Sequence, residues 1–167
     1  MTGQRFFNAH GKDQPITSWT VETVGKVLVE ALRMHERIYR SWGPGAGGGT
    51  AWPAILRDWE DILNQVGGGE TFRERNTTRV ALTADQVTRV DQVVEWQMRY
   101  LARQQGPARV LSLWLLCKIR RWKFRDACRR AGIAPSTAYW ARDRALRLIA
   151  EGLIRDGVEP FGMGRIR

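Results

Sequence analysis

The sequence predicts an all-α fold, a helical bundle that ends in a C-terminal helix-turn-helix. Apolar residues recur at steps of three and four along several segments, which is the spacing of one face of an α-helix. No segment alternates apolar and polar residues for long enough to predict a strand, so a sheet has no source. Glycine and proline clusters separate the periodic segments and mark the connections between helices.

Residues 1–17 lack sustained periodicity and are expected to form a flexible arm. A helical pattern begins near Ser18 and carries one apolar stripe. Its members are Val21, Val24, Leu28, Leu32, His35, Ile38 or Tyr39, and Trp42. Because His35 lies on this stripe, we expect it to be a buried or boundary residue rather than a catalyst.

Glycines dominate residues 43–49, and Gly43, Gly45 and Gly48 match the G-x-G-x-x-G spacing of dinucleotide-binding loops. Such a loop follows a strand, whereas this segment follows a predicted helix. We therefore expect a flexible linker inside an N-terminal helical region that spans residues 18–69.

A second helix is predicted from residue 52 to residue 63, with Pro53 suited to a first helical position. Residues 70–82 are rich in charge and poor in apolar side chains, which is typical of a connector. A C-terminal helical domain is then expected over residues 83–154, followed by a tail over residues 155–167.

Thr83 and Gln86 form a capping box at the start of this domain. The apolar positions of the helix that follows are Val87, Val90, Val94, Met98 and Leu101. Gly106 and Pro107 should break that helix. The next helix is the most hydrophobic in the chain and should lie at the centre of the core; its apolar residues are Val110, Leu111, Leu113, Trp114, Leu115 and Leu116.

Residues 122–149 predict a helix, a glycine turn and a second helix. Gly132 ends the first helix because glycine readily adopts positive φ. Pro135 and Ser136 are start signals for a helix expected from about Thr137, with Ser136 or a neighbour as its cap. The positions between the two helices are small enough for close crossing, as in a helix-turn-helix: Ala127, Ala131, Ile133, Ala138 and Ala141.

Five residues lie on the outward side of the second helix, where a recognition helix faces base edges in the major groove. We predict base readout by Ser136, Thr137, Tyr139, Trp140 and Asp143. The segment resembles the fourth region of sigma factors, and aligns with it without a gap. The matching positions are Phe124, Ala127-Cys128, Gly132-Ile133, Thr137 and Arg144-Ala145-Leu146, and Tyr139-Trp140 departs from the pattern because polar residues are commoner there.

A set of short motifs is spread over roughly residues 19–153: WTVE at 19–22, WPAI at 52–55 with Asp58-Trp59, the 82–98 helix with Trp96, WKF at 122–124, and Arg144-Ala145-Leu146 with Ile149-Ala150. With these landmarks the whole chain resembles an uncharacterised family of short, tryptophan-rich proteins from proteobacteria and their phages. This resemblance implies a phage-linked or regulatory DNA-binding role, with no defined biochemical activity attached.

The charge distribution points in the same direction. The net charge is +10, but residues 1–105 hold 13 Lys and Arg against 12 Asp and Glu, whereas residues 106–167 hold 14 against 5. Such an asymmetry is typical of a nucleic-acid-binding domain. The predicted phosphate contacts are Lys118, Arg120, Arg121, Lys123, Arg125, Arg129, Arg130, Arg142, Arg144 and Arg147.

Other classes of protein have less support. Cys117 and Cys128 fall in predicted helices and are expected to be core thiols of a cytoplasmic protein. His10 and His35 lack paired ligand spacing, so neither a metal nor a cofactor is expected. No nucleophile or acid–base motif predicts an enzyme, and no apolar run is long enough to predict a membrane span.

These observations favour a sequence-specific, double-stranded DNA-binding transcription regulator, with RNA polymerase or another regulator as a candidate partner. One alternative is a phage small terminase subunit, a packaging protein that recognises DNA as a homo-oligomeric ring. Another is a protein-interaction adaptor, because the N-terminal half is nearly neutral and rich in tryptophan.

Overall fold

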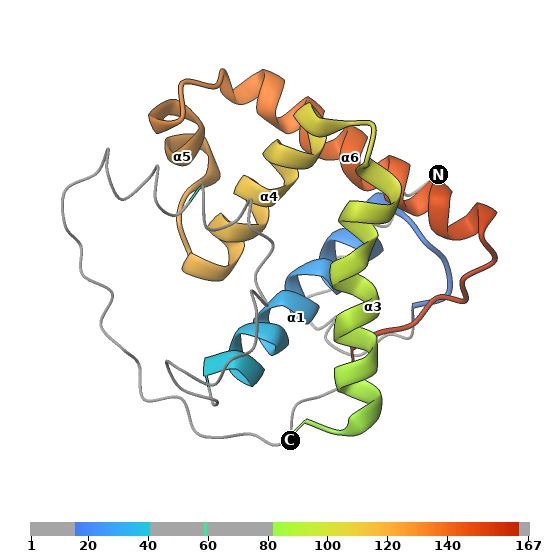
Figure 1. Cartoon of the computed structure of the whole chain (residues 1–167). Coiled ribbons are helices and arrows are strands. Elements are labelled where there is room, and N and C mark those ends of the chain that lie inside the picture. Colours follow the sequence, from blue (N-terminus) through green and yellow to red (C-terminus); the bar gives the residue numbers. More distant parts are fainter. Residues whose placement is uncertain (1–15, 41–58, 60–81, 164–167) are drawn as a thin grey trace, which may run out of the picture.

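Helices form all the regular secondary structure in the described part of the chain, which comprises residues 16–40, 59 and 82–163 of the computed structural model (Figure 1). The all-α expectation is therefore confirmed for these residues. The helices are α1 (Val21–Arg40), α3 (Ala84–Leu101), α4 (Gln105–Arg120), α5 (Phe124–Arg130) and α6 (Pro135–Arg155).

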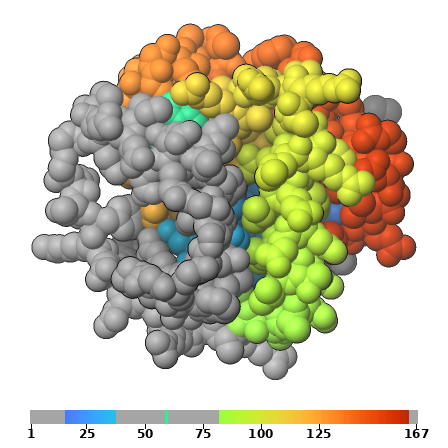
Figure 2. All heavy atoms as spheres, viewed as in Figure 1, coloured from blue at the N-terminus to red at the C-terminus, as the bar shows by residue number. Residues whose placement is uncertain are grey.

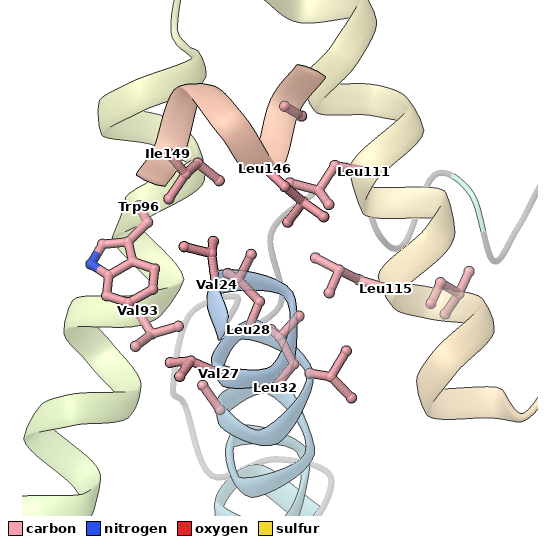
Figure 3. Close-up of a cluster of buried hydrophobic side chains, with 14 of the residues drawn as sticks. Val24, Val27, Leu28, Leu32, Val93, Trp96, Leu111, Leu115, Leu146 and Ile149 are labelled. Atoms are coloured by element: carbon pink, nitrogen blue, oxygen red, sulfur yellow. The ribbon is translucent and has the colours of Figure 1, made fainter. Parts of the chain in front are cut away.

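Helix α1 packs against α3, α4 and α6 and carries much of the core. Its residues Val24 and Leu28 are fully buried, and Leu32 is nearly so. Figure 3 shows this face of α1 directed toward Val93 of α3 on one side and Leu115 of α4 on the other. The predicted N-terminal and C-terminal regions therefore share one hydrophobic core through α1.

The start of α1 is set by two threonines. The backbone N–H of Thr20 donates to the Thr23 hydroxyl at 2.7 Å, and the N–H of Thr23 donates to the Thr20 hydroxyl at 3.2 Å. These bonds satisfy donors that have no partner within the first helical turn. The helix accordingly begins at Val21, three residues after the predicted start near Ser18.

The capping box of α3 is present as predicted, with the Thr83 side chain accepting from the Gln86 backbone and the reverse bond also formed. The predicted apolar stripe is wrong at Met98, which is 76% exposed. Trp96 is buried instead, because the rings of Trp19 and Phe161 pack against it at centroid distances of 5.2 and 5.8 Å. Figure 2 shows α3 along one face of the molecule, with α6 beside it.

Helix α4 is central to the core, as the sequence predicts. Leu111, Leu113 and Leu115 are fully buried. The helix begins at Gln105, so Gly106 and Pro107 lie within its first turn, where the missing N–H of proline costs little. It ends at Arg120, and the C-cap residue that follows, Arg121, adopts a left-handed conformation with φ of 59°.

Residues 158–163 form a C-terminal strap over α1 and α3. The Trp19 indole N–H donates to the Val158 carbonyl at 2.7 Å, and the Phe161 ring meets Trp19 edge-on at 5.5 Å. The Arg89 guanidinium donates to the Gly162 carbonyl at 3.0 Å, and Met163 is fully buried. These residues of the predicted tail therefore pack on the helices, and their apolar side chains complete the core.

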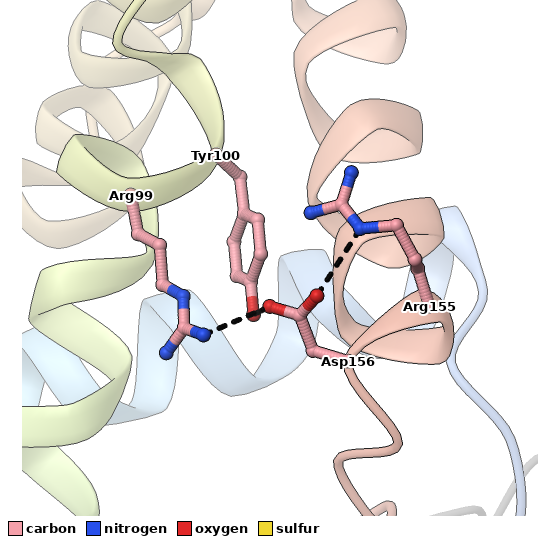
Figure 4. Close-up of polar contacts among 4 residues, drawn as sticks. All are labelled: Arg99, Tyr100, Arg155 and Asp156. Carbon is pink, nitrogen blue, oxygen red and sulfur yellow. Dashed lines mark hydrogen bonds and ion pairs between the residues drawn. The ribbon is translucent and has the colours of Figure 1, made fainter.

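A polar cluster fastens the end of α6 to the end of α3 (Figure 4). The Asp156 carboxylate accepts a hydrogen bond from the Tyr100 hydroxyl and forms ion pairs with Arg99 and Arg155, all between 3.0 and 3.1 Å. The Tyr100 hydrogen bond is the first cause of a lowered pKa of Asp156.

Trp59 is the one described residue between residues 40 and 82. It is helical and 3% exposed, and its indole N–H donates to the Arg109 carbonyl at 2.9 Å. The rest of the predicted helix over residues 52–63 lies outside the described residues, as do the glycine-rich linker at 43–49 and nearly all of the connector at 70–82.

Candidate nucleic-acid interface

Helices α5 and α6 are joined by a short turn whose geometry centres on Gly132. This glycine has φ of +70°, and the next amide, of Ile133, donates to the Cys128 carbonyl at 2.8 Å. The turn at Gly132 therefore forms as predicted. The prediction for the start of α6 is wrong by two residues: Pro135 is the first helical residue, Ala134 is the N-cap, and no side chain caps the helix.

Small side chains fill the space between α5 and α6. Ala127 on α5 is 4% exposed, and Ala138 and Ala141 on α6 are 0% and 7% exposed. Ala131 and Ile133 in the turn are half-buried against the same core. This burial leaves the opposite side of α6 facing solvent.

The five predicted readout residues all lie on that solvent-facing side. Ser136 and Thr137 are exposed in the first turn of α6, and Asp143 has a side chain that is 44% exposed. Tyr139 and Trp140 are 40% and 62% exposed, which is unusual for large aromatic residues. The first half of α6 thus presents polar and aromatic groups together.

The two aromatic residues differ in how firmly they are held. The Tyr139 ring packs edge-on against Phe124 of α5 at 5.2 Å, and the Arg142 guanidinium lies 5.0 Å from its centroid. Trp140 contacts the Arg144 guanidinium at 5.4 Å. Tyr139 is therefore anchored to α5, whereas Trp140 and Arg144 project together from α6.

Arg142 and Asp143 are engaged with each other. The Nε and Nη2 atoms of Arg142 donate to one Asp143 oxygen at 2.8 and 2.6 Å. The Arg142 guanidinium also lies 5.6 Å from the Trp114 ring of α4, and its side chain is only 21% exposed. These two predicted DNA contacts consequently form a local pair, which partly neutralises both charges.

Exposed cations surround the α5–turn–α6 unit. Of the predicted phosphate contacts, those classed as exposed are Lys118, Arg121, Lys123, Arg125, Arg129, Arg130, Arg144 and Arg147. Arg129 lies 3.9 Å from the Asp126 carboxylate, a distance at which two exposed charges interact weakly. These side chains give the unit an open, positively charged surface.

Arg120 differs from its neighbours and has to be removed from the predicted phosphate contacts. Its Nη1 atom donates to the Glu36 carboxylate of α1 at 2.6 Å, and its side chain is 10% exposed. The sequence could not reveal this, because the partner lies 84 residues away in the chain.

The two cysteines are buried thiols. Burial raises the pKa of Cys117 to about 12, and it also raises the pKa of Cys128. Both thiols are therefore protonated and poorly nucleophilic at neutral pH. No group of three or more His, Cys, Asp or Glu side chains with metal-binding geometry occurs among the described residues.

Comparison with protein-family models, curated proteins and solved structures finds no match to this chain. The function is therefore inferred from the charge and geometry of the α5–turn–α6 unit. Within the described residues, no helix has both the length and the apolar character that crossing a membrane requires.

The sequence did not predict that α1 would border this surface. An open hollow of about 510 Å³ lies between α1, α4 and α6, and its lining includes Lys26 and Arg33 of α1, Lys118 of α4, and Arg142 and Asp143 of α6. The one available signal was the repeat of charged residues on α1 at helical spacing, which is also the pattern of an ordinary solvated face.

Proposed function

We propose that this protein is a sequence-specific, double-stranded DNA-binding transcription regulator, in which α5, the turn at Gly132 and α6 act as a helix-turn-helix. The observation that carries the proposal is the exposed first half of α6, which presents Ser136, Thr137 and Trp140 between exposed cations of α5 and α6. That arrangement is what insertion of a helix into the major groove requires.

In this proposal α6 reads bases and α5 contacts the backbone. Ser136 and Thr137 can exchange hydrogen bonds with base edges, while the Trp140 ring can pack against thymine methyl groups. Arg125, Arg129 and Arg130 of α5 would bind phosphates and fix the register of the protein on the duplex.

The start of α6 adds a further source of phosphate binding. Ala134 provides no side-chain cap, and no acidic residue occurs in the first turn, so no side chain of that turn competes for the backbone N–H groups at the start of α6. A helix N-terminus of this kind favours an anion. The proposed link to phages and to RNA polymerase depends on the sequence resemblances alone.

The salt dependence of DNA binding tests the proposal. If about six cations neutralise phosphates, the slope of log affinity against log salt should be about −5, since each contact contributes about −0.9. Replacing Arg129 and Arg130 by Ala should flatten the slope by about 1.8. The matched control is Arg103→Ala, an exposed cation in the turn after α3, which should leave the slope unchanged.

Two results would overturn the proposal. A slope near zero would show that the exposed cations do not meet phosphates. If fragments selected from random genomic DNA bind with the same affinity as all other sequences, the protein does not read the base sequence. Light scattering of the same preparation separates a monomer or dimer, as expected for a simple regulator, from a ring-sized assembly, which would favour DNA packaging instead.

A further inference from the structure

The hollow between α1, α4 and α6 carries more positive charge than its neighbours neutralise. In the described part of the chain, no carboxylate lies within ion-pair distance of Lys26, Arg33 or Lys118. All three side chains are exposed. They come from two helices and meet around one concavity, which makes it a candidate anion-binding surface.

One of the three acidic groups around the hollow is neutralised by a cation. Asp143 accepts both hydrogen bonds of Arg142. The Glu22 carboxylate accepts hydrogen bonds from its own backbone N–H and from the Thr20 side chain, which lower its pKa. Glu22 stays ionised and Glu30 is the other remaining carboxylate in the lining, so Lys26, Arg33 and Lys118 exceed the two carboxylates by one positive charge.

The position of α1 relative to α6 is fixed by close packing beneath the hollow. A Cβ atom at Gly25 would lie 3.4 Å from the Trp114 ring and 3.6 Å from the Leu146 side chain, so the α1 backbone itself approaches both residues. The Arg120–Glu36 ion pair adds a second fixed point farther along α1. The backbone positions from which Lys26 and Arg33 extend are therefore fixed relative to α6.

We propose that α1 supplies part of the DNA interface, with Lys26 and Arg33, together with Lys118, binding the sugar–phosphate backbone beside the groove that α6 enters. This inference rests on the proposed DNA-binding function. The same hollow is lined by Asp143, one of the outward residues of α6, so a duplex seated on α6 brings a backbone to this side. The wide mouth and mixed cations suit a polymer backbone, for which only charge and reach are needed.

The test measures DNA affinity of the full chain at several salt concentrations. The double variant Lys26→Ala/Arg33→Ala should flatten the log–log slope by about 1.8 and weaken binding by about eightfold per lost contact near 0.1 M salt. Arg103→Ala is the matched control and should change neither. Glu30→Gln should strengthen binding roughly twofold to fivefold, the range of a single interaction between exposed charges.

The outcomes separate this inference from the proposed function. If Arg129→Ala/Arg130→Ala weakens binding while Lys26→Ala/Arg33→Ala does not, the α1 contact is wrong and the helix-turn-helix assignment survives. If the wild-type chain does not bind duplex DNA, both fail. Lys26→Gln serves as the second variant, since Lys26 has no hydrogen bond or ion pair in the described residues and its loss should not affect folding. The Lys26→Gln variant should flatten the log–log slope by about 0.9, and an unchanged slope would show that Lys26 does not contact a phosphate.

Discussion

The Arg120 guanidinium donates a 2.6 Å hydrogen bond to the Glu36 carboxylate, and this pair joins the last turn of α4 to α1. The two side chains are 10% and 15% exposed. Replacing either by Ala leaves the other charge largely buried, so we expect a loss of roughly 2–3 kcal/mol in the free energy of unfolding. Urea denaturation of both single variants and the double variant measures this loss.

The double variant should lose less stability than the sum of the two single variants, because each single change already breaks the pair. Lys118→Ala is the control and should stay within about 0.5 kcal/mol of the wild type, as exposed substitutions generally do. Arg120→Ala should also leave the salt slope of DNA binding unchanged. A slope flatter by about 0.9 in the Arg120→Ala variant would show that Arg120 does bind a phosphate.

Two helical glycines should respond oppositely to Ala. At Gly152 a Cβ atom would lie 2.6 Å from Cε1 of the Tyr100 ring and closer still to Cδ1, so Gly152→Ala should destabilise by about 1–3 kcal/mol through overpacking. At Gly25 the nearest atoms lie at 3.4 and 3.6 Å, which is close to ordinary contact, so the better helix propensity of Ala should stabilise by about 0.5–1 kcal/mol. Thermal unfolding compares the two. Equal effects would contradict the tight α3–α6 approach.

Stability should fall as His35 is protonated. Burial is the main cause of a pKa of His35 below its ordinary 6.5, opposed by the nearby charges of Asp91 and Glu36. On acidification His35 takes up a proton in the unfolded chain before it does so in the folded chain. The contribution of neutral His35 to the free energy of unfolding is therefore fully present above about pH 6.5, and it is lost as the pH falls through the lowered pKa of the folded state. Urea denaturation between about pH 7.5 and pH 5 should show the loss, and His35→Gln should reduce it. The same pH dependence in His35→Gln would assign the effect to other groups.

Tyr139 and Trp140 should separate stability from DNA binding. Trp140 is 62% exposed, so Trp140→Ala should change stability by less than about 0.5 kcal/mol while weakening specific DNA binding. Tyr139→Ala removes a ring that packs on Phe124, so it should cost about 1–2 kcal/mol of stability and also relax sequence preference. Denaturation and binding to selected and random duplexes give both quantities. Unchanged specificity in Trp140→Ala would remove that residue from the readout.

Local patterns in the sequence predicted local structure well. The capping box at Thr83 and the turn at Gly132 are present, because both depend on residues within a few positions of each other. In the apolar stripe of α1, Val24, Leu28, Leu32 and His35 are likewise buried, and Val21 is partly buried. Periodicity alone could therefore predict these helices and the side of α6 that faces solvent.

Features that depend on distant partners could not be predicted in this way. Met98 fits the apolar spacing of α3, yet the packing of Trp19 and Phe161 selects the Trp96 side of the helix. Arg120 has the same local context as its exposed neighbours but meets Glu36 in the fold. The strap has no periodic pattern, since it is not helical and packs against side chains that are distant in the sequence, such as Trp19 and Arg89.

The strap cannot pack on α1 and α3 until residues 158–163 have been synthesised, so it sets the earliest time at which folding can finish. Trp19 and Val158 are 139 positions apart, and a ribosome adding about 5–20 residues per second needs roughly 7–28 s to make that interval. Throughout that time the nascent chain displays the apolar face of α1, including Leu28 and Leu32, without its complete set of partners. Molecular chaperones that recognise exposed apolar segments would find their binding site on α1 during synthesis.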